Sequence, residues 1–518
     1  MINLKGEIIM KKIIVIAIAA FIASVSVNAQ TVQDAVRYST LSYVGSTARS
    51  TGMAGAFGAL GGDFLSLATN PAGIAVYRSG ELSFTPSVFT ANTSSEFLNN
   101  KTVESASKFN IGNIGLVIPF EAGENAQKYG FKMFNFGIGI NRTGNYRRNI
   151  YGKGYNGDNS ITTGWVDYLN SVNPNIRFDE EGNPIIYGLD SYSTRLAWNT
   201  NLIFTYNDPS SNLTHLLSDM YGGQVNQSVR LNTSGSSNEY DMTFGFNWND
   251  IIYFGTTMGI PYLYYNERYV LTETDATEYG HDYFNKMSYS TELKTSGTGI
   301  NLKFGAIIKP VQFLRIGVAY HTPSWYDLKD SYIAVMDADL DLSGNRNFKS
   351  YHDDAELYYK YKLKTPARYM ASLGLVIGQY GMIGAEYQYV DYTTAKFSSK
   401  EDIYADDVFE ITNSDIVNSL KATSTFRFGT EWAIGIFRIR GGYSFGTSPY
   451  LATDDLNDQT ETFSLGAGLR FEKFLLDFGY ARTKEYGYFY PYTVAYPSPN
   501  VKSVYKYDQM QLTLGFRF

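Results

Sequence analysis

Apolar residues alternate with polar or small residues through most of this chain, and the C-terminal segment shows the pattern without interruption. From residue 509 to residue 518, every even-numbered position is Met, Leu or Phe, whereas the odd-numbered positions hold Gln, Thr, Gly and Arg. Successive side chains of a β-strand point to opposite faces. A period of two therefore predicts a strand with one wholly apolar face.

The same alternation recurs upstream, for example at 463–471 and 134–141. The predicted strands lie at residues 81–92, 107–120, 131–149, 224–248, 251–271, 287–309, 312–338, 354–378, 380–397, 422–434, 436–448, 460–472, 473–486 and 504–518. Fourteen strands form an even set, which brings the first and last strands to the same rim of a closed barrel.

The predicted connections distinguish a membrane barrel from a soluble β-sandwich, which alternates in the same way. Tight turns such as 309–311 and 471–473 alternate with long polar loops such as 398–421 and 487–503. Short turns on one rim and long loops on the other are typical of outer-membrane barrels. Because unpaired backbone is costly in lipid, the sheet must close on itself. We predict an all-β fold, a transmembrane antiparallel β-barrel of about 14 strands.

The composition fits this fold and argues against several kinds of site. Aromatic residues make up 16% of the chain, which suits aromatic girdles at the membrane interfaces. The net charge of −7 gives no reason to expect nucleic acid as a partner. The chain has no Cys, and its four His lack zinc-binding spacing. We expect no enzymatic activity, no catalytic residues, no metal and no cofactor.

The N-terminus carries an export signal. Residues 10–29 begin with Met-Lys-Lys, continue with an apolar run and end with Val-Asn-Ala. This pattern predicts a cleaved secretory signal peptide at 1–29. Together with the barrel pattern it predicts the bacterial outer membrane as the location.

Residues 30–80 do not alternate. Residues 51–63 are small and Gly-rich, Asn70 favours a turn, and Pro71 fixes its own φ angle. A compact apolar segment ahead of a barrel predicts a plug, or hatch, in the lumen at 30–80. The barrel then takes residues 81–518, with a long, partly helical extracellular insertion at about 150–223.

The hatch sequence resembles a known family. "GMAGAFGALGGDFLSLATNPAGIAV", followed directly by a strand from Glu81, is similar to the N-terminal hatch of the FadL/TodX-type outer-membrane transporters. The motif residues here are Asn70, Pro71, Ala72 and Gly73, and the C-terminal Phe518 is also typical of such barrels. The resemblance implies a fourteen-stranded barrel that carries fatty acids, aromatic hydrocarbons or other hydrophobic molecules. One branch of the family serves protein secretion.

Two segments of the insertion have helical spacing of apolar residues. They contain Trp165 and Leu169 in the first, and Leu213, Leu216, Leu217 and Met220 in the second. Outside the cell these stripes are a candidate groove for capturing a greasy ligand. The alternative is that two helices cap the barrel and bury their stripes against each other.

Basic residues dominate the inward-facing charges of the predicted strands. The candidate contacts for an anionic headgroup are Arg315, Arg368, Arg427, Arg438 and Arg440. Such cations attract a carboxylate. The alternative is a structural salt-bridge network that stiffens the barrel and docks the hatch.

Two functions remain open on this evidence. In the first, a hydrophobic small molecule enters at the extracellular loops and leaves either past a moving hatch or sideways through the wall. The broken alternation at 110–115 predicts a β-bulge where the wall could open. In the second, the chain is an accessory barrel in an outer-membrane assembly or secretion complex. The expected partners are the hydrophobic ligand, outer-membrane lipid or lipopolysaccharide, and, in the second function, partner proteins.

Overall fold

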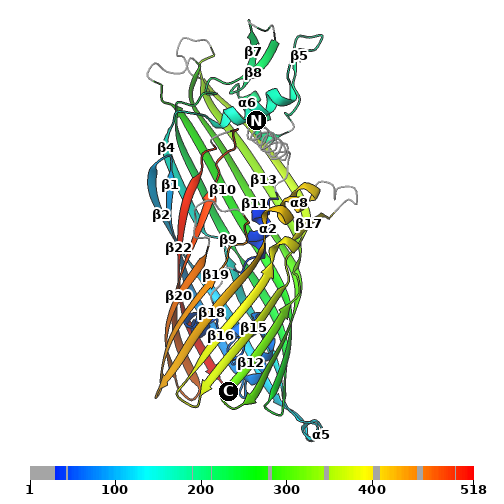
Figure 1. The fold of residues 1–518 in the computed structure, drawn as a ribbon, viewed down its shortest axis with the longest axis vertical. Helices are drawn as coiled ribbons and strands as arrows, with labels where there is room; N and C mark the ends of the chain where they lie inside the picture. Colours follow the sequence, from blue (N-terminus) through cyan, green and yellow to red (C-terminus); the bar gives the residue numbers. More distant parts are fainter. Residues whose placement is uncertain are drawn as a thin grey trace, which may run out of the picture.

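The computed structural model describes residues 30–41, 45–189, 191–209, 211, 213–277, 283–342, 349–400, 409–451, 459–495 and 498–518, so the predicted signal peptide lies outside the described residues. One sheet of 18 strand segments closes into a barrel of 14 antiparallel strands (Figure 1). The last segment pairs with the first, which completes the barrel. The predicted fold class is confirmed.

Four wall strands consist of two segments each, which reconciles 18 segments with 14 strands. The wall strands in chain order are β1 (Glu81–Phe97), β2 (Asn100–Glu121), β3 (Phe131–Asn145) with β4 (Arg148–Asn156), β9 (Val225–Trp248), β10 (Ile252–Asp275), β11 (Phe284–Val311), β12 (Leu314–His321) with β13 (Trp325–Leu340), β14 (Lys349–Lys364) with β15 (Arg368–Ile377), β16 (Gly381–Asp391) with β17 (Lys396–Ser399), β18 (Ala422–Ile434), β19 (Phe437–Gly446), β20 (Thr460–Arg470), β21 (Phe474–Phe489) and β22 (Val501–Arg517). Each predicted strand overlaps one of them.

The outer face of the barrel is apolar where the alternation predicted it. In β22, Leu512 and Leu514 are 40% and 48% exposed, whereas Gln511 and Thr513 face inward and are each 2% exposed. The same arrangement, with large apolar side chains outside and polar ones inside, recurs around the wall and is the inverse of that in a water-soluble protein. This inversion is typical of a membrane barrel. In the described part of the chain, no helix is long and apolar enough to cross a membrane.

The long connections gather at one rim, opposite the short turns and the C-terminus (Figure 1). At the short-turn rim, α5 (Glu124–Lys128) lies between β2 and β3. The remaining elements are α6 (Ile161–Val172), β5 (Arg177–Phe178), β6 (Pro184–Ile185), α7 (Tyr192–Asn199), β7 (Phe204–Asp208), β8 (Leu213–Leu217), η2 (Tyr392–Thr394) and α8 (Glu410–Ser419). They lie toward the long-loop rim and partly cover it.

One prediction for the insertion is wrong. Residues 213–217 form β8, which pairs with β7 as a hairpin, and not a helix. Cross-strand pairing overrides the helical spacing of Leu213, Leu216 and Leu217, because apolar spacing over one or two turns is a weak signal. The first helical segment is confirmed as α6, and the second helix of the insertion is α7.

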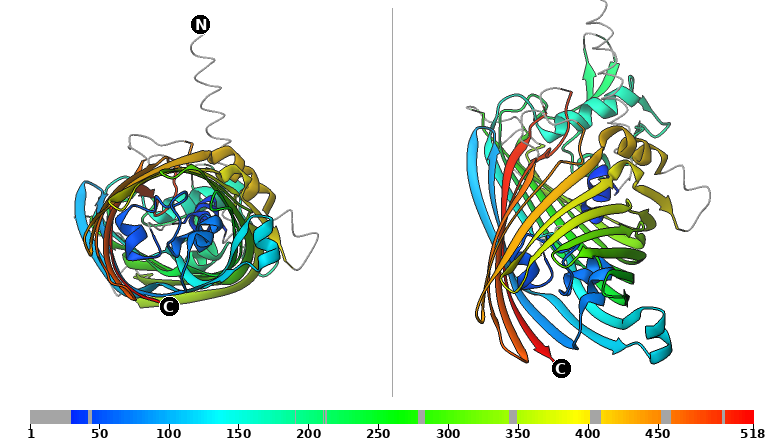
Figure 2. Two further views of the ribbon diagram at one scale, coloured as in Figure 1. Left: turned by 90° about the horizontal axis from the view of Figure 1, so that it is seen from below. Right: turned by 60° about the horizontal axis from the view of Figure 1, so that its bottom comes forward.

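The N-terminal segment fills the lumen. Its elements are α2 (Val32–Ser39), α3 (Ala48–Gly52), α4 (Leu65–Ala68) and the 3₁₀ helix η1 (Pro71–Val76). Seen along the barrel in Figure 2, these elements lie inside the ring of strands. Most of their residues are buried. We use "hatch" for residues 30–80.

Candidate functional site

Glycines in the wall hold the hatch at backbone distance. Inward-facing glycines lie directly opposite one another on neighbouring strands, as in the run Gly245, Gly255 and Gly305 and the run Gly374, Gly384, Gly429 and Gly442. A Cβ at Gly255 would lie 2.2 Å from the carbonyl carbon of Pro71, and one at Gly384 would lie 2.3 Å from the Ala56 oxygen. Gly255 and Gly384 therefore tolerate no side chain while the hatch is in place, because the atoms that a Cβ would meet there belong to the hatch backbone.

The Asn70–Pro71–Ala72–Gly73 motif lies at one of these contacts. The Asn70 side chain accepts a hydrogen bond from the Ala72 N–H (3.2 Å), which caps η1. Its Nδ2 donates to the Gly58 carbonyl at 2.7 Å, so the side chain ties two hatch turns together. A Cβ on Gly73 would lie 2.7 Å from the Ser66 Cβ, so this glycine permits the turn to pack on α4. A role for the motif in gating stays a prediction.

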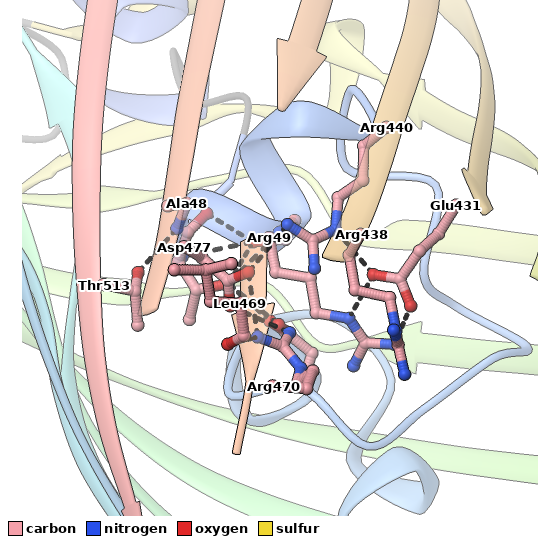
Figure 3. Close-up of polar contacts among 12 residues, drawn as sticks. Ala48, Arg49, Glu431, Arg438, Arg440, Leu469, Arg470, Asp477 and Thr513 are labelled. Carbon is pink, nitrogen blue, oxygen red and sulfur yellow. Dashed lines mark hydrogen bonds and ion pairs between the residues drawn. The ribbon is translucent and has the colours of Figure 1, made fainter. Parts of the chain in front are cut away.

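A buried ion network joins the hatch to the wall (Figure 3). Arg49 of α3 donates to both carboxylate oxygens of Glu431, at 2.9 and 3.1 Å. Arg440, 2% exposed, bridges Glu431 and Asp477, with its Nη1 2.7 Å from Asp477 Oδ1. Arg470 also binds Asp477, at 2.8 Å. Each carboxylate is therefore shared between two cations, a geometry that strengthens charged hydrogen bonds.

The five candidate headgroup arginines all have partners in the protein. Arg315 and Arg368 donate to the hatch carbonyls of Leu60 and Ser39. Arg427 binds Glu386 at 2.7 Å and Gln388 at 3.0 Å, and Arg440 belongs to the network above. Arg438 donates to carbonyls of its own turn, at 2.7 and 2.8 Å. Headgroup contact stays a prediction for them, but these bonds favour the alternative in which they dock the hatch and stiffen the wall.

The wall has a window between β2 and its neighbour. The β2–β3 ladder runs only from Glu121 to Asn113, where Asn113 Nδ2 donates to Asn141 Oδ1 at 2.8 Å. In the described part of the chain, no ladder joins residues 105–112 of β2 to residues 142–149. Above this stretch, the Thr102 hydroxyl bonds the Tyr151 carbonyl. We use "wall window" for the stretch of the wall in which residues 105–112 and residues 142–149 do not pair with each other.

Two bulges form the wall window. Thr85 of β1 pairs with Asn113 and Pro86 pairs with Ile111, which leaves Gly112 as the extra residue. The bulge predicted at 110–115 is confirmed. A second irregularity in β3 leaves Thr143 without a counterpart on β9. Bulges end regular pairing and re-aim side chains, so the strands part at this height.

A cleft lies behind the wall window. The residues that line it include Phe89, Asn110, Arg142 and Gln511. The buried Nε of Arg142 and the buried Oδ1 of Asn110 have no hydrogen-bond partner among the described residues. The cleft therefore presents one unpartnered donor and one unpartnered acceptor in a mostly polar lining, in which Phe89 is the one large apolar residue.

Arg142 was absent from the sequence prediction for a physical reason. Strict alternation from Phe134 to Ile140 assigns residue 142 to the lipid-facing side. The irregularity at Thr143 changes the parity, and Arg142 lines the cleft instead. Two consecutive polar residues after an apolar run, Asn141 and Arg142, are the one signal in the sequence.

A second cavity lies between the hatch and the wall. Its lining includes Leu65 and Thr69 of the hatch and Thr143, His321 and Arg427 of the wall. Thr143 lines this second cavity, whereas its chain neighbours Arg142 and Gly144 line the cleft. The two spaces therefore flank the β3 irregularity from either side.

The candidate loop groove is filled with protein. Leu169, Leu216 and Met220 are at most 1% exposed and belong to an apolar cluster with barrel strands. Trp165 packs edge-on against Tyr289 of β11, with ring centroids 5.7 Å apart. Of the predicted set, Leu213 is 36% exposed and Leu217 is half-buried. These contacts favour the alternative, in which the insertion caps the barrel.

A polar network fastens this cap. The Tyr492 hydroxyl donates to Asn159 Oδ1 at 2.9 Å and accepts from Asn156 Nδ2 at 3.0 Å. Burial raises the pKa of Tyr492 well above its ordinary value, because the phenolate would lose its hydration.

Among the residues that the structure describes, no three His, Cys, Asp or Glu side chains gather as metal ligands would.

Comparison with known proteins identifies the fold. No protein-family model matches the sequence, and no curated protein matches it. A Pseudomonas aeruginosa FadL homologue has a similar structure, with a TM-score of 0.52, 13% identity, and coverage of 91% of this chain and 98% of that one. The P. putida toluene transporter TodX is similar over 92% of this chain and 99% of its own, with a TM-score of 0.51 and 11% identity. This chain has the fold of the FadL/TodX-type barrels.

Proposed function

We propose that this chain is an outer-membrane channel for hydrophobic small molecules, which leave the lumen sideways through the wall window. The wall window carries the proposal. Its lower edge lies beside Phe109 and Ile111, which are 66% and 45% exposed on the apolar outer surface. A molecule passing from the cleft through this opening would reach the outer part of the bilayer without crossing water.

The seating of the hatch favours this route over a movement of the hatch. The hatch is bound by ion pairs, by wall glycines and by hydrogen bonds such as Asn135 Nδ2 to the carbonyls of Ile74 (2.6 Å) and Tyr77 (2.9 Å). Its displacement would break contacts all around the ring. Sideways exit would leave these ion pairs and hydrogen bonds in place, although the hatch also reaches the wall window, where Tyr38 packs edge-on against Tyr146.

The ligand class follows from the lining and the relatives. The similar structures are a FadL homologue and the toluene transporter TodX. The unpartnered donor and acceptor of the cleft, beside the Phe89 ring, suit the polar end of such a ligand. We infer a ligand with an apolar body of fatty-acid or aromatic type.

Filling the wall window tests the function. Gly144 borders the cleft, and a Cβ there would lie 3.3 Å from Ser237 Cβ and from the Tyr146 hydroxyl, so Gly144→Leu crowds the wall at the wall window. The matched control is Gly441→Leu, where a Cβ would meet no atom within 4 Å. Uptake of a long-chain fatty acid and of a monoaromatic hydrocarbon is measured in cells that express each variant. The proposal requires about a tenfold loss with Gly144→Leu alone; equal uptake by both variants contradicts it.

The accessory-barrel alternative makes a different prediction. A structural subunit of an outer-membrane complex would co-purify with a stoichiometric partner protein and show no dependence of uptake on the wall window. Mass spectrometry of the protein purified in mild detergent separates the two functions. Co-purified hydrophobic small molecules favour the channel.

A further inference from the structure

Three neighbouring strands of the wall are interrupted at one height. β12 ends at His321, which pairs with Arg368, the first residue of β15, and Arg368 pairs with Val390 near the end of β16. Below these breaks, β12, β15 and β16 contain 8, 10 and 11 residues. A transmembrane strand needs about 9–11 residues. The breaks therefore mark the outer boundary of the membrane on this side of the barrel.

A row of tyrosines lies just below the breaks and supports this boundary. Tyr320, Tyr369 and Tyr389 are directly opposite one another on β12, β15 and β16. Their rings face outward, 36%, 53% and 36% exposed, with neighbouring centroids 5.2 and 6.4 Å apart. Tyrosine collects at membrane–water interfaces, where the ring meets lipid and the hydroxyl meets water.

A concentration of lysines lies directly above this row, on the outer face of β13, β14 and β17. All of its members are exposed. The "lysine patch" comprises Lys329, Lys360, Lys362, Lys364, Lys396 and Lys400. Asp327 offers a carboxylate within it, 3.1 Å from Lys400. The patch is thus strongly positive although the whole chain carries a net charge of −7.

The strand register places like charges against each other. Lys329 of β13 is directly opposite Lys360 of β14, and Lys364 of β14 is directly opposite Lys396 of β17. Side chains at such positions have Cβ atoms about 4.5–5.5 Å apart, and like charges there are destabilising. Lys360 has a further interaction within the protein, so the Lys364–Lys396 pair is the one that creates a demand for an anion on the outer surface of the barrel.

We propose that the lysine patch binds the phosphate groups of a phosphorylated glycolipid of the outer leaflet, of the lipid A type. The patch faces lipid headgroups, not the lumen, because it lies on the outer face directly above the tyrosine row. Clustered ammonium groups at this depth attract anionic headgroups. A phosphate between Lys364 and Lys396 would turn a repulsive pair into two charge-assisted contacts. This inference needs the barrel in its membrane but does not depend on transport.

The experiment uses the full mature protein in detergent, with diphosphoryl lipid A as the probe. Thermal unfolding is followed by heat-modifiable gel migration while the lipid is titrated. The test variant combines Lys329→Gln, Lys364→Gln and Lys396→Gln. The control combines three exposed lysines on β2, β4 and β22, on the far side of the barrel in strand order, none of which lies opposite another lysine: Lys101→Gln, Lys153→Gln and Lys502→Gln.

The proposal predicts a lipid-dependent rise in Tm for the native protein and for the control, since a ligand that binds only the folded state stabilises it. The test variant should bind about a hundredfold more weakly, given the usual contribution of each lysine near a charged headgroup. Without lipid its Tm should equal or exceed that of the native protein, because repulsion has been removed. That result also shows that the variant folds.

Three outcomes would overturn the proposal. They are an unchanged lipid response in the test variant, an equal loss in the control, and an equal response to lipid A from which both phosphates have been removed. Inorganic phosphate alone is the final arm. It should give no rise in Tm, and a rise equal to that with lipid A would assign the patch to free anions and refute the choice of a glycolipid.

Discussion

A disulfide between the hatch and the wall would decide between the two exit routes. A Cβ at Gly374 of β15 would lie 3.5 Å from the Cβ of Ala59 in the hatch. Disulfides join Cβ atoms about 3.5–4.5 Å apart, so Ala59→Cys with Gly374→Cys forms a bond with little movement. The nearest obstacle is Leu60 Cδ2 at 2.8 Å, the end of a flexible side chain. The natural chain has no Cys, so there is no competing thiol.

The energy of hatch displacement can be worked from one contact. Moving α3 separates Arg49 from Glu431, and breaking a buried ion pair costs about 3–5 kcal/mol. Even the lower figure leaves a displaced population of about 1% or less. The engineered bond closes a loop of about 300 residues, which stabilises the folded protein by about 6 kcal/mol on the chain-entropy estimate, and it ties the hatch covalently to the wall. It therefore removes a displaced state that is already rare.

The assay is uptake of a long-chain fatty acid by cells that express the double-cysteine variant, with and without dithiothreitol. Exit through the wall window predicts equal uptake, within about twofold, in the oxidised and reduced states. The single substitutions Ala59→Cys and Gly374→Cys control for the side chains alone. A loss of uptake in the oxidised double variant that dithiothreitol restores would refute the fixed hatch and assign the route to hatch movement.

Four further predictions follow from the same contacts. Deleting Gly112 should straighten β2, narrow the wall window and lower uptake, while Tm stays near the native value; normal uptake would count against the bulge as an opening. Arg440→Ala leaves two buried carboxylates short of a partner and should destabilise the barrel by about 3–5 kcal/mol in urea titration; a change below about 1 kcal/mol would show that the network is not stabilising. Gly255→Ala places a methyl group against Pro71 and should expose the hatch to proteolysis, whereas Gly441→Ala should not. Deleting residues 30–76 should abolish or deregulate uptake, and normal hydrophobic uptake by the truncated protein would exclude any need for the hatch.

The strands of the barrel wall could be predicted from the sequence, but the contacts inside the lumen could not. Alternation is local, so the fourteen strands, the turns between them and the apolar outer face could all be predicted from neighbouring residues. The partners of Arg315 and Arg368 could not, because they are hatch carbonyls more than 250 positions away in the chain. The bulge at Gly112 was visible as a break in alternation, whereas the irregularity at Thr143 was hidden in a polar stretch.

The wall window begins just above the part of β2 and β3 that packs most closely on the hatch. Gly115 of β2 and Gly139 of β3 pair with each other, and both face the hatch: added Cβ atoms would lie 2.3 Å from Phe64 and 3.4 Å from Leu67. The Asn113–Asn141 pair, two residues higher, is the last rung of the ladder. Below this rung the hatch backs the wall, and strand pairing is continuous. Above it the hatch still touches the wall, through Ser46 behind Gly112 and Tyr38 against Tyr146, but both strands bulge and the β2–β3 ladder has ended. A hatch that stays in place therefore defines the floor of the lateral route, and the route needs it as a fixed surface.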